Sequence, residues 1–482
     1  MKMKVAFLAL IFLLAIALRT RGLQNSATDW HAFRQADTAS VTREYVKHGV
    51  DFLHPHYHDL SNIQSGKDNL AGYRMVEFPL INGVIAYAVR ALPFLDLVVF
   101  SRLVSVLFSL GTLLAIYWIG KEWSGEAVGL LAALAFAILP YSIFYSRVVL
   151  PEPAFLCFIT ASVAFFQVWL RKRSWAYYLL SLITMSLALL LKPFGLFLVP
   201  VFAVMTLREF GWRSIKHIEL VLFGVLAVVP LYAWRHWILQ FPSGIPASDW
   251  LFNGDGIRLR PAWFRWLIWE RLTKLILGVT GLELLAMGLL PPLTFKSRAD
   301  WIVKAKEWIP YLSWWLGILA YFIVIATGNV RHDYYQVFVL PIICLSIGRG
   351  VWLTYQQGLK WGQKGVVTSL SLIIFFVGVM VWFSDRQVRG YYGTRLDWET
   401  AGQAVDQLLP LDAKVIAPAF GDTAFLFQTN RTGWPIGFDI EDKIAKGAEY
   451  YVSTAYDDEA RELEKKYQVL EKTSNHIIIK LQ

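Results

Sequence analysis

The sequence predicts an α-helical polytopic membrane protein with a small C-terminal α/β domain. Hydrophobic residues make up 56% of the 482-residue chain and aromatic residues make up 15%, which is far from the composition of a soluble globular protein. A transmembrane helix needs about 20 largely apolar residues, and about eleven stretches qualify by that rule. They lie near residues 5–20, 97–120, 126–146, 152–170, 175–192, 194–208, 217–238, 273–294, 309–327, 335–355 and 365–384.

The first apolar stretch begins close to the N-terminus. Lys2 and Lys4 precede it, as in a signal peptide, but RTRGL follows where a small-residue cleavage site would stand. We therefore expect an uncleaved anchor with a cytoplasmic N-terminus.

Residues 21–96 are expected to form one large external loop. It opens with TDWHAFRQADTASVTRE at 28–44, a dense run of ionisable side chains. The apolar stretch 78–94 inside this loop contains Arg90 and is bounded by two prolines. If it crossed the bilayer, every later loop would change sides, so we expect an interfacial helix on the external face.

The placement of charge supports this topology. The short external turns carry Arg147, Lys192 and Arg331, whereas the expected cytoplasmic loops are rich in lysine and arginine. This asymmetry follows the positive-inside rule and accounts for the net charge of +10 without a nucleic-acid partner. The cytoplasmic set is Lys121, Arg171, Lys172, Arg173, Arg208, Arg213, Lys216, Lys296, Arg298, Lys304, Lys306, Lys360 and Lys364.

The segment 385–482 differs in composition from the membrane domain at 1–384. Helix-like stretches (DWETAGQAVDQLL and YDDEARELEKKY) alternate with β-rich ones (KVIAPAF, EYYVST and HIIIKL). This alternation predicts a small α/β domain, which the topology places outside the cell membrane. It contains no glycine-rich phosphate loop, so we expect it to recognise a ligand or to pack rather than to catalyse.

Ionisable side chains gather at the external ends of the expected helices. Charge at membrane depth is costly and marks a cavity or a substrate path. Basic groups and carboxylates that meet where lipid meets water suit an anionic lipid head group, attacked by a nucleophile whose proton a carboxylate removes. The set is Asp29, Asp37, Glu77, Arg147, Glu152, Lys192, Arg331, His332, Asp333, Tyr334 and Tyr335.

Each of these residues also has a structural interpretation. Asp29 and Asp37 suit the N-cap of a juxtamembrane helix, and Glu152 lies at a helix start where the dipole favours a carboxylate. Lys192 is placed to snorkel, and the tyrosines near 334 are typical of an aromatic belt. Both interpretations stay open at this point.

Histidines and cysteines indicate no metal motif. His54, His56 and His58 alternate and invite a metal site, but their proline-containing loop favours solvated histidines. Cys157 and Cys344 fall inside apolar helices and suit small hydrophobic residues.

The order of these motifs resembles the GT-C class of integral-membrane glycosyltransferases that use polyprenyl-phosphate sugars. Within that class it is similar to the protein O-mannosyltransferase and aminoarabinose transferase group, glycosyltransferase family 39 and its relatives. The resemblance covers roughly residues 5–345. It rests on TREYVKHG, EFPL at 77–80, FSRLVSVLF at 100–108, LPEP at 150–153, LLLKPF around Lys192, and HDYYQVFVLP at 332–341.

The resemblance implies a GT-C scaffold in the cytoplasmic membrane that transfers a hexosyl or pentosyl group. The donor is a polyprenyl-phosphate sugar, and the acceptor is a hydroxyl of a lipid, glycan or protein. A catalytic carboxylate is implied in the first external loop and a second at Glu152. Lys192, Tyr334 and Arg331 are implied to contact the lipid phosphate.

Two positions depart from the family pattern. The Asp-Glu pair of the first loop aligns with Arg34 and the glutamine after it, so Asp37 or Asp29 must supply the base. We prefer Asp37 because it lies nearer the family's position. Phe78 replaces the lysine of the Glu-Lys-Pro element, which makes Arg74 the candidate for that phosphate contact.

We expect an inverting displacement, in which a first-loop aspartate deprotonates the acceptor while basic groups stabilise the leaving phosphate. A Mg²⁺ or Mn²⁺ ion on Asp37 and Glu152 is one option, and a metal-free basic site is the other. A polymerase or ligase of lipid-linked glycans is the main rival. A lipid or glycolipid transporter is a weaker one, because the chain has no internal repeat and its charges lie at one face.

Overall fold

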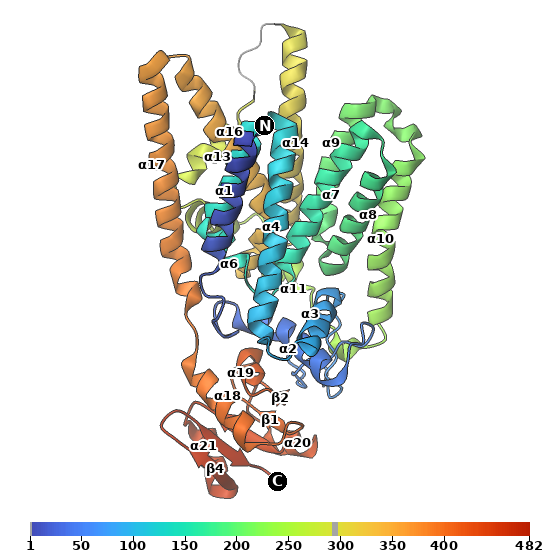
Figure 1. Cartoon of the computed structure of the whole chain (residues 1–482). Helices are drawn as coiled ribbons and strands as arrows, with labels where there is room; N and C mark the ends of the chain where they lie inside the picture. The colour runs from blue at the N-terminus through green and yellow to red at the C-terminus, as the bar shows by residue number, and fades with distance from the viewer. Residues whose placement is uncertain (1, 292–296) are drawn as a thin grey trace.

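The computed structural model describes residues 2–291 and 297–482, and Lys296 and the end of the expected helix near 273–294 lie outside them. A bundle of long helices forms most of the molecule, and a small α/β domain lies at the end opposite the start of α1 (Figure 1). The fold class expected from the sequence is therefore confirmed. The helices of the bundle and the first loop are α1 (Lys2–Arg19), α2 (Ala32–His48), α3 (Leu80–Ala91), α4 (Leu97–Ser124), α5 (Glu126–Ile138), α6 (Pro140–Tyr145), α7 (Glu152–Lys172), α8 (Trp175–Leu191), α9 (Val199–Phe210), α10 (Ile218–Ile238), α11 (Trp250–Asn253), α12 (Pro261–Phe264), α13 (Gly281–Leu289), α14 (Arg298–Val324), α15 (Ala326–Arg331), α16 (Leu340–Leu359) and α17 (Gly362–Val388).

Among the described residues, seven helical segments are long and apolar enough to cross a membrane, or eight if one bent pair counts as a span. The chain is therefore an integral membrane protein. Shorter apolar helices occupy two further stretches of the expected transmembrane set, α5 and α8, and α3 occupies the stretch expected as an interfacial helix. The seven segments are Leu97–Ser124, Glu152–Lys172, Pro193–Lys216, Ile218–Ile238, Glu307–Val324, Asp333–Leu359 and Gly362–Leu408.

The expected helix at 126–146 is broken at Pro140 into α5 and α6. Proline has no N–H group, so the carbonyl of Phe136 loses its helical partner. Arg19, which is fully buried, donates to this carbonyl at 3.1 Å and to the next one, of Ala137, at 3.2 Å. It also donates to Ser109 of α4 at 3.1 Å. One buried arginine thus ties the end of α1 to the break.

The prediction of a single helix near 273–294 is wrong. The segment instead forms a π-helix, η4 (Arg265–Ile276), followed by α13, and the two are bent by 113°. Gly278 and Val279 between them have φ of 47° and 68°. A Cβ on Gly278 would lie 2.0 Å from the carbonyl oxygen of Met380, so the chain turns here to let α17 approach closely.

Small residues allow the membrane helices to pack closely. A Cβ on Gly350 of α16 would lie 1.8 Å from the carbonyl oxygen of Leu284 in α13, and one on Gly288 would lie 1.8 Å from that of Ser346. In a lipid environment helices associate through such close backbone packing. This packing holds α16 at the centre of the bundle.

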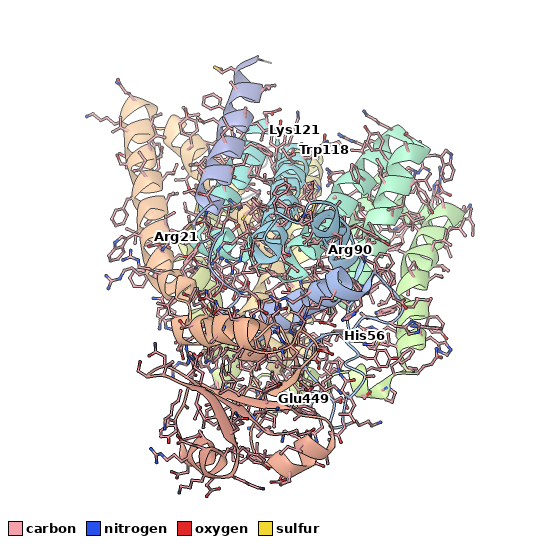
Figure 2. All side chains as sticks on the ribbon, turned by 60° about the horizontal axis from the view of Figure 1, so that its bottom comes forward. Arg21, His56, Arg90, Trp118, Lys121 and Glu449 are labelled. Carbon is pink, nitrogen blue, oxygen red and sulfur yellow. The ribbon has the colours of Figure 1, made fainter. Side chains whose placement is uncertain are left out.

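The first loop forms a layer across one end of the bundle. Helices α2 and α3 lie against each other there, and Asn82 donates to the Thr38 carbonyl at 2.8 Å and to Thr42 Oγ1 at 2.9 Å. Figure 2 brings this end forward and shows His56 of the loop between Arg90 of α3 and Glu449 of the C-terminal domain. Because α2 contacts both α4 of the bundle and α19 of the C-terminal domain, the loop lies between the membrane helices and that domain.

The C-terminal domain is built on a five-stranded sheet with the order β2-β1-β3-β5-β4. Strand β1 pairs in parallel with β2 and β3, whereas β5 pairs antiparallel with β3 and β4. Its elements are α18 (Leu396–Leu408), β1 (Lys414–Ile416), α19 (Thr423–Gln428), β2 (Thr432–Trp434), α20 (Ile440–Ala445), β3 (Tyr450–Ser453), α21 (Asp458–Lys466), β4 (Gln468–Lys472) and β5 (Ile477–Lys480).

Candidate active site

A cavity lies between the first loop and the ends of α4, α7 and α8. Its polar lining includes Arg34 and Asp37 of α2, together with Arg74 and Glu77 from the chain that leads to α3. Its volume is about 50 Å³, so it admits water but is smaller than a sugar phosphate. The apolar part of the lining includes Val41, Phe78, Ile81, Ile85, Val149, Leu150 and Leu191.

Asp37 is held from both sides. Its Oδ2 accepts from Arg74 Nη2 at 3.0 Å and from Gln64 Nε2 at 3.1 Å. Its Oδ1 accepts from the hydroxyl of Thr423, in the C-terminal domain, at 2.7 Å. Arg74 also donates to the Gln64 side-chain oxygen. The carboxylate is 2% exposed, and it lines the cavity.

A second chain of ion pairs begins at Glu77. Glu77 accepts from Arg34 and lies 3.3 Å from Lys192 Nζ, which in turn lies 3.0 Å from Glu152 Oε1. Burial alone would raise the pKa of Glu77, but the charges of Arg34 and Lys192 outweigh it and hold that pKa well below its ordinary value. Glu152 Oε2 is buried and has no hydrogen-bond partner among the described residues.

The rings of Tyr334, Tyr335 and His332, which we call the aromatic wall, border this chain of ion pairs. Lys192 Nζ lies 5.9 Å from the ring centre of Tyr334 and 5.8 Å from that of Tyr335. The His332 ring stacks on Tyr334 at 5.4 Å. Burial, followed by the neighbouring charge of His31, lowers the pKa of His332 to about 4. His332 is therefore neutral at neutral pH and offers the site a ring rather than a charge.

Asp29 lies in a separate cluster of fully buried side chains. Its Oδ2 accepts from Arg147 Nη2 at 2.7 Å and from Arg102 Nη2 at 3.1 Å, and its Oδ1 accepts from Gln35 Nε2 at 2.5 Å. The side chains of all three charged residues are 0% exposed. Asp29 therefore joins α4 and the turn before α7 to the first loop.

Arg331 belongs neither to the contacts of Asp37 nor to the chain of ion pairs that begins at Glu77. Its guanidinium pairs with Asp255 through an Nε contact of 2.9 Å and is 55% exposed. Arg331 does not line the cavity. Among the residues that the structure describes, its guanidinium contacts Asp255 and the ring of Trp250 rather than Arg147 or Lys192.

The three loop histidines have separate partners. His54 pairs with Asp51 at 2.8 Å, His56 Nδ1 bonds to the Ala71 carbonyl at 2.7 Å, and buried His58 lies 3.2 Å from Glu44. In residues 2–291 and 297–482, no group of three or more His, Cys, Asp or Glu side chains is arranged to hold a metal ion. Asp37 and Glu152 are instead paired with Arg74 and Lys192.

Sequence reasoning missed a buried pair beside the aromatic wall. Asp333 accepts from His31, from the hydroxyl of Tyr145 at 2.6 Å and from Trp30 Nε1 at 3.2 Å. His31, at the start of α2, has a left-handed backbone with φ of 58°. The pair fixes that start, and thereby the direction in which α2 presents Arg34 and Asp37.

Gln64 and Thr423 were also missed. Neither residue ionises, and Thr423 lies 386 positions from Asp37 in the chain. The sequence offers no signal for this contact, because it arises only when the C-terminal domain packs on the first loop. Asp333 itself was in the predicted set, within the motif HDYYQVFVLP, but its pairing with His31 was not predicted.

The sequence of a known family matches part of this chain. The family described as "Dolichyl-phosphate-mannose-protein mannosyltransferase" matches residues 69–243. An undecaprenyl phosphate-alpha-4-amino-4-deoxy-L-arabinose arabinosyl transferase of Yersinia enterocolitica is 26% identical over 402 residues, 77% of this chain and 64% of that protein. An uncharacterized protein of Aquifex aeolicus is 24% identical over 289 residues, 59% of this chain and 62% of that protein. The chain thus spans somewhat less than two thirds of these relatives.

Solved structures share the fold. ArnT from Cupriavidus metallidurans bound to undecaprenyl phosphate superposes with a TM-score of 0.65 at 13% identity, over 98% of each chain. The archaeal oligosaccharyltransferase AglB from Archaeoglobus fulgidus, in complex with an inhibitory peptide and a dolichol-phosphate, gives 0.60 at 11% identity, over 94% of this chain and 69% of that one. These matches establish that the chain shares the fold of ArnT and AglB.

Proposed function

We propose that the protein transfers a hexosyl or pentosyl group from a polyprenyl-phosphate donor to a hydroxyl of a lipid, glycan or protein. The observation that carries this proposal is the cavity that Asp37, Arg34, Arg74 and Glu77 line together, in a fold that ArnT shares. Transfer takes place on the extracytoplasmic face of the cytoplasmic membrane. The α/β domain lies on that same face.

The donor phosphate is bound by the basic side chains that now pair with carboxylates. Arg34, Arg74 and Lys192 are the cations at the cavity and in the ion pairs that extend from it. Because the cavity is small and these pairs are buried, the pairs of Arg34 and Lys192 with Glu77 and Glu152 must part to admit the donor. Arg74 keeps its Nη2 contact with Asp37, because its Nε–H has no partner among the described residues and is available to the phosphate. Charge-assisted hydrogen bonds to phosphate then replace those to the carboxylates. The ring of Tyr334 lies beside Lys192 and borders the proposed phosphate position.

Asp37 acts as the general base. The acceptor hydroxyl attacks the anomeric carbon from the side opposite the phosphate, and the bond from that carbon to the phosphate oxygen breaks. The hydroxyl proton moves to Asp37, and polyprenyl phosphate leaves with one more negative charge than the donor carried. The anomeric configuration is inverted.

Charge balance favours this assignment. The ion pairs contain three carboxylates, Asp37, Glu77 and Glu152, and the three cations named above. During transfer the leaving phosphate gains one negative charge while Asp37 loses one by taking up the proton. The net charge of this low-dielectric site therefore stays constant through the reaction, which lowers its electrostatic cost.

We propose that transfer needs no metal ion. A divalent cation on Asp37 and Glu152 would have to displace Arg74 and Lys192, which already neutralise these carboxylates. Activity should therefore persist in EDTA. Loss of activity in EDTA and its return with Mg²⁺ or Mn²⁺ would instead assign a metal to these two side chains.

The test is transfer from a panel of polyprenyl-phosphate sugars to cell-envelope acceptors, comparing wild type with Asp37→Asn, Asp29→Asn and Glu152→Gln. Wild type should form product with at least one donor, and Asp37→Asn should not. If all three folded variants keep full activity, the carboxylate mechanism is wrong. Product from a lipid-linked oligosaccharide but from no monosaccharide donor would favour a ligase.

The proposed orientation has its own test. Lys67 in the first loop and Lys172 at the end of α7 are both exposed. In a background without Cys157 and Cys344, Lys67→Cys should react with an impermeant thiol reagent added outside the cell, and Lys172→Cys should not. The reverse labelling pattern would place the cavity on the cytoplasmic side.

A further inference from the structure

The C-terminal domain reaches into the cavity wall through one hydroxyl group. Thr423, the first residue of α19, is 4% exposed. Its Oγ1 lies 2.7 Å from Asp37 Oδ1 and 3.0 Å from the carbonyl oxygen of Phe33. A hydroxyl group has one proton to donate and two lone pairs to accept with. Thr423 thus faces two acceptors with one proton.

The two positions of that proton suit the two protonation states of Asp37. When Asp37 is ionised, the hydroxyl donates to Oδ1. When Asp37 is protonated, the hydroxyl can turn to donate to the Phe33 carbonyl and accept from the carboxyl O–H. Both states are then satisfied without movement of a heavy atom.

The other carboxylate oxygen of Asp37, Oδ2, has no acceptor nearby for a carboxyl proton among the described residues. Oδ2 faces Arg74 Nη2 and Gln64 Nε2, and both groups are donors that carry no acceptor lone pair. A proton taken up by the carboxyl group therefore resides on Oδ1, and Thr423 is its partner there. A buried O–H without a partner would be destabilising.

We propose that Thr423 is a positioning residue for the transfer reaction: its hydroxyl turns as Asp37 takes up the acceptor's proton, so that the C-terminal domain completes the active site. This inference rests on the proposed role of Asp37 as the base. It assigns the domain a part in the chemistry, in addition to the recognition or packing role that its sequence suggested.

The docking of the domain is firm enough to hold one hydroxyl group in place. Gly433 N–H donates to the His58 carbonyl at 2.9 Å, and Leu60 N–H donates to the Gly433 carbonyl at 2.8 Å. The guanidinium of Arg43 lies 3.6 Å from the ring centre of Phe427. These contacts come from α19 itself and from β2, the strand that follows it, so the position of Thr423 is set by more than one element of the interface.

Several ionisable groups share the surroundings of Asp37 and act on it in every variant. Burial raises the pKa of Asp59 and of Asp422 to about 6, and in each case the charge of Asp37 adds to the rise. Because these groups stay in place when Thr423 is changed, a difference between variants reports the hydroxyl itself. The groups that face Asp37 are Arg34, Tyr57, Asp59, Arg74 and Asp422.

The test compares Thr423→Val, Thr423→Ser and Thr429→Val. Thr429 is the matched control, because it is a fully buried threonine next to α19 whose hydroxyl donates to the Leu426 carbonyl at 2.7 Å. Thr423→Val should lower kcat about tenfold, as expected for loss of a hydrogen bond to a charged group. The acid limb of its kcat/KM profile should move up by about one pH unit, because the ionised form loses the stronger bond.

The serine variant should restore both the rate and the profile, and Thr429→Val should match wild type. Equal profiles for wild type and Thr423→Val would overturn the inference. So would a serine variant as impaired as the valine variant, or a Thr429→Val variant with the same defect.

An infrared measurement separates this inference from the proposed function. The carboxyl bands that disappear in Asp37→Asn belong to Asp37, and they can be followed during titration of the protein without any donor. The C=O band of the protonated form should shift in Thr423→Val and return in Thr423→Ser. If no donor yields product but this shift is seen, the proposed function fails, while the hydrogen bond between Thr423 and the protonated carboxyl group stands. If transfer occurs without the shift, the inference alone fails.

Discussion

Asp29 and Asp37 lie eight residues apart in the first loop, yet their surroundings differ in kind. Asp29 is sealed among Arg102, Arg147 and Gln35, and its side chain is 0% exposed. Asp37 is also buried, but it borders a cavity. The partners on its two sides differ as well, with cationic and amide donors at Oδ2 and a hydroxyl at Oδ1.

In the proposed mechanism, this difference decides which of the two carboxylates acts as the base. Both aspartates are neutralised, so charge alone does not distinguish them. Asp29 has donors on both oxygens, including two arginines from different segments, and removal of one partner would leave a buried charge. Asp37 has an oxygen whose partner can accept as well as donate, beside a space that another molecule can enter.

The largest expected effect is on the rate of Asp37→Asn. The amide keeps the shape of the side chain but cannot take a proton, and loss of a general base typically costs about 10²–10⁴-fold in rate. Initial transfer rates would show this loss while the melting temperature stays near that of wild type. Asp96→Asn, at the exposed N-cap of α4, is the control and should keep the wild-type rate. A fully active Asp37→Asn would remove the distinction between the two aspartates.

Asp29→Asn should instead lower stability. It leaves two buried arginines without a counter-charge, and breaking a buried pair in this way costs about 3–5 kcal/mol. The expected result is a lower yield and melting temperature in detergent. Asp385→Asn is the control, because Asp385 pairs with the half-exposed Arg21 and a surface pair contributes about 0–1 kcal/mol. An Asp29→Asn variant with normal stability and no activity would make Asp29 the base.

Lys192 and Arg331 extend the comparison to the cations. Lys192→Met removes a buried contact to the proposed phosphate position and should raise KM for the donor by about 10–100-fold. Arg331→Met should leave KM unchanged, because Arg331 is half-exposed and paired with Asp255. Steady-state kinetics with a saturating acceptor measure both values. Equal effects of the two substitutions on KM would contradict this prediction, because both side chains would then contact the phosphate.

Asp59 is a buried carboxylate with neither the arginines of Asp29 nor the cavity of Asp37. Burial raises its pKa to about 6, so folding holds a proton that the unfolded chain releases near pH 4. Stability therefore falls as pH rises from about 4 to about 6 and then levels.

Asp59→Asn cannot ionise, so its stability should not fall over this pH range. The amide oxygen of the asparagine can still accept from the Ser61 N–H, a bond of 2.8 Å in the wild type. The variant should be more stable at pH 7 by up to about 3 kcal/mol, and the difference should vanish near pH 4. Melting curves across this range measure it. A constant difference between the two proteins at every pH would contradict the assignment.

The sequence was sufficient for the features that depend on local pattern. Apolar length predicted the membrane helices, and the charge at one end of them pointed to Asp37, Glu77, Glu152 and Lys192. The structure places Asp37 and Glu77 in the wall of one cavity and links Glu77 through Lys192 to Glu152. Apolar length alone did not reveal the 113° bend between η4 and α13. That bend depends on how closely Met380, a hundred residues further on, approaches Gly278.

Roles set by distant partners were not predictable. Asp29 looked equivalent to Asp37 because its partners Arg102 and Arg147 come from other segments. His31 and Asp333 stand 302 positions apart. Thr423 belongs to a domain whose composition suggested no part in catalysis. Each of these pairs forms only when separate elements pack together.

The most direct test of the comparison is to locate the donor phosphate. A polyprenyl-phosphate analogue with a photoreactive group next to its phosphate would be crosslinked to the wild-type protein, and the labelled peptides would be identified by mass spectrometry. We predict labelling of residues 34–42 and 74–79, at the cavity that Asp37 lines. Labelling confined to the segments around Asp29, Arg102 and Arg147 would contradict the account.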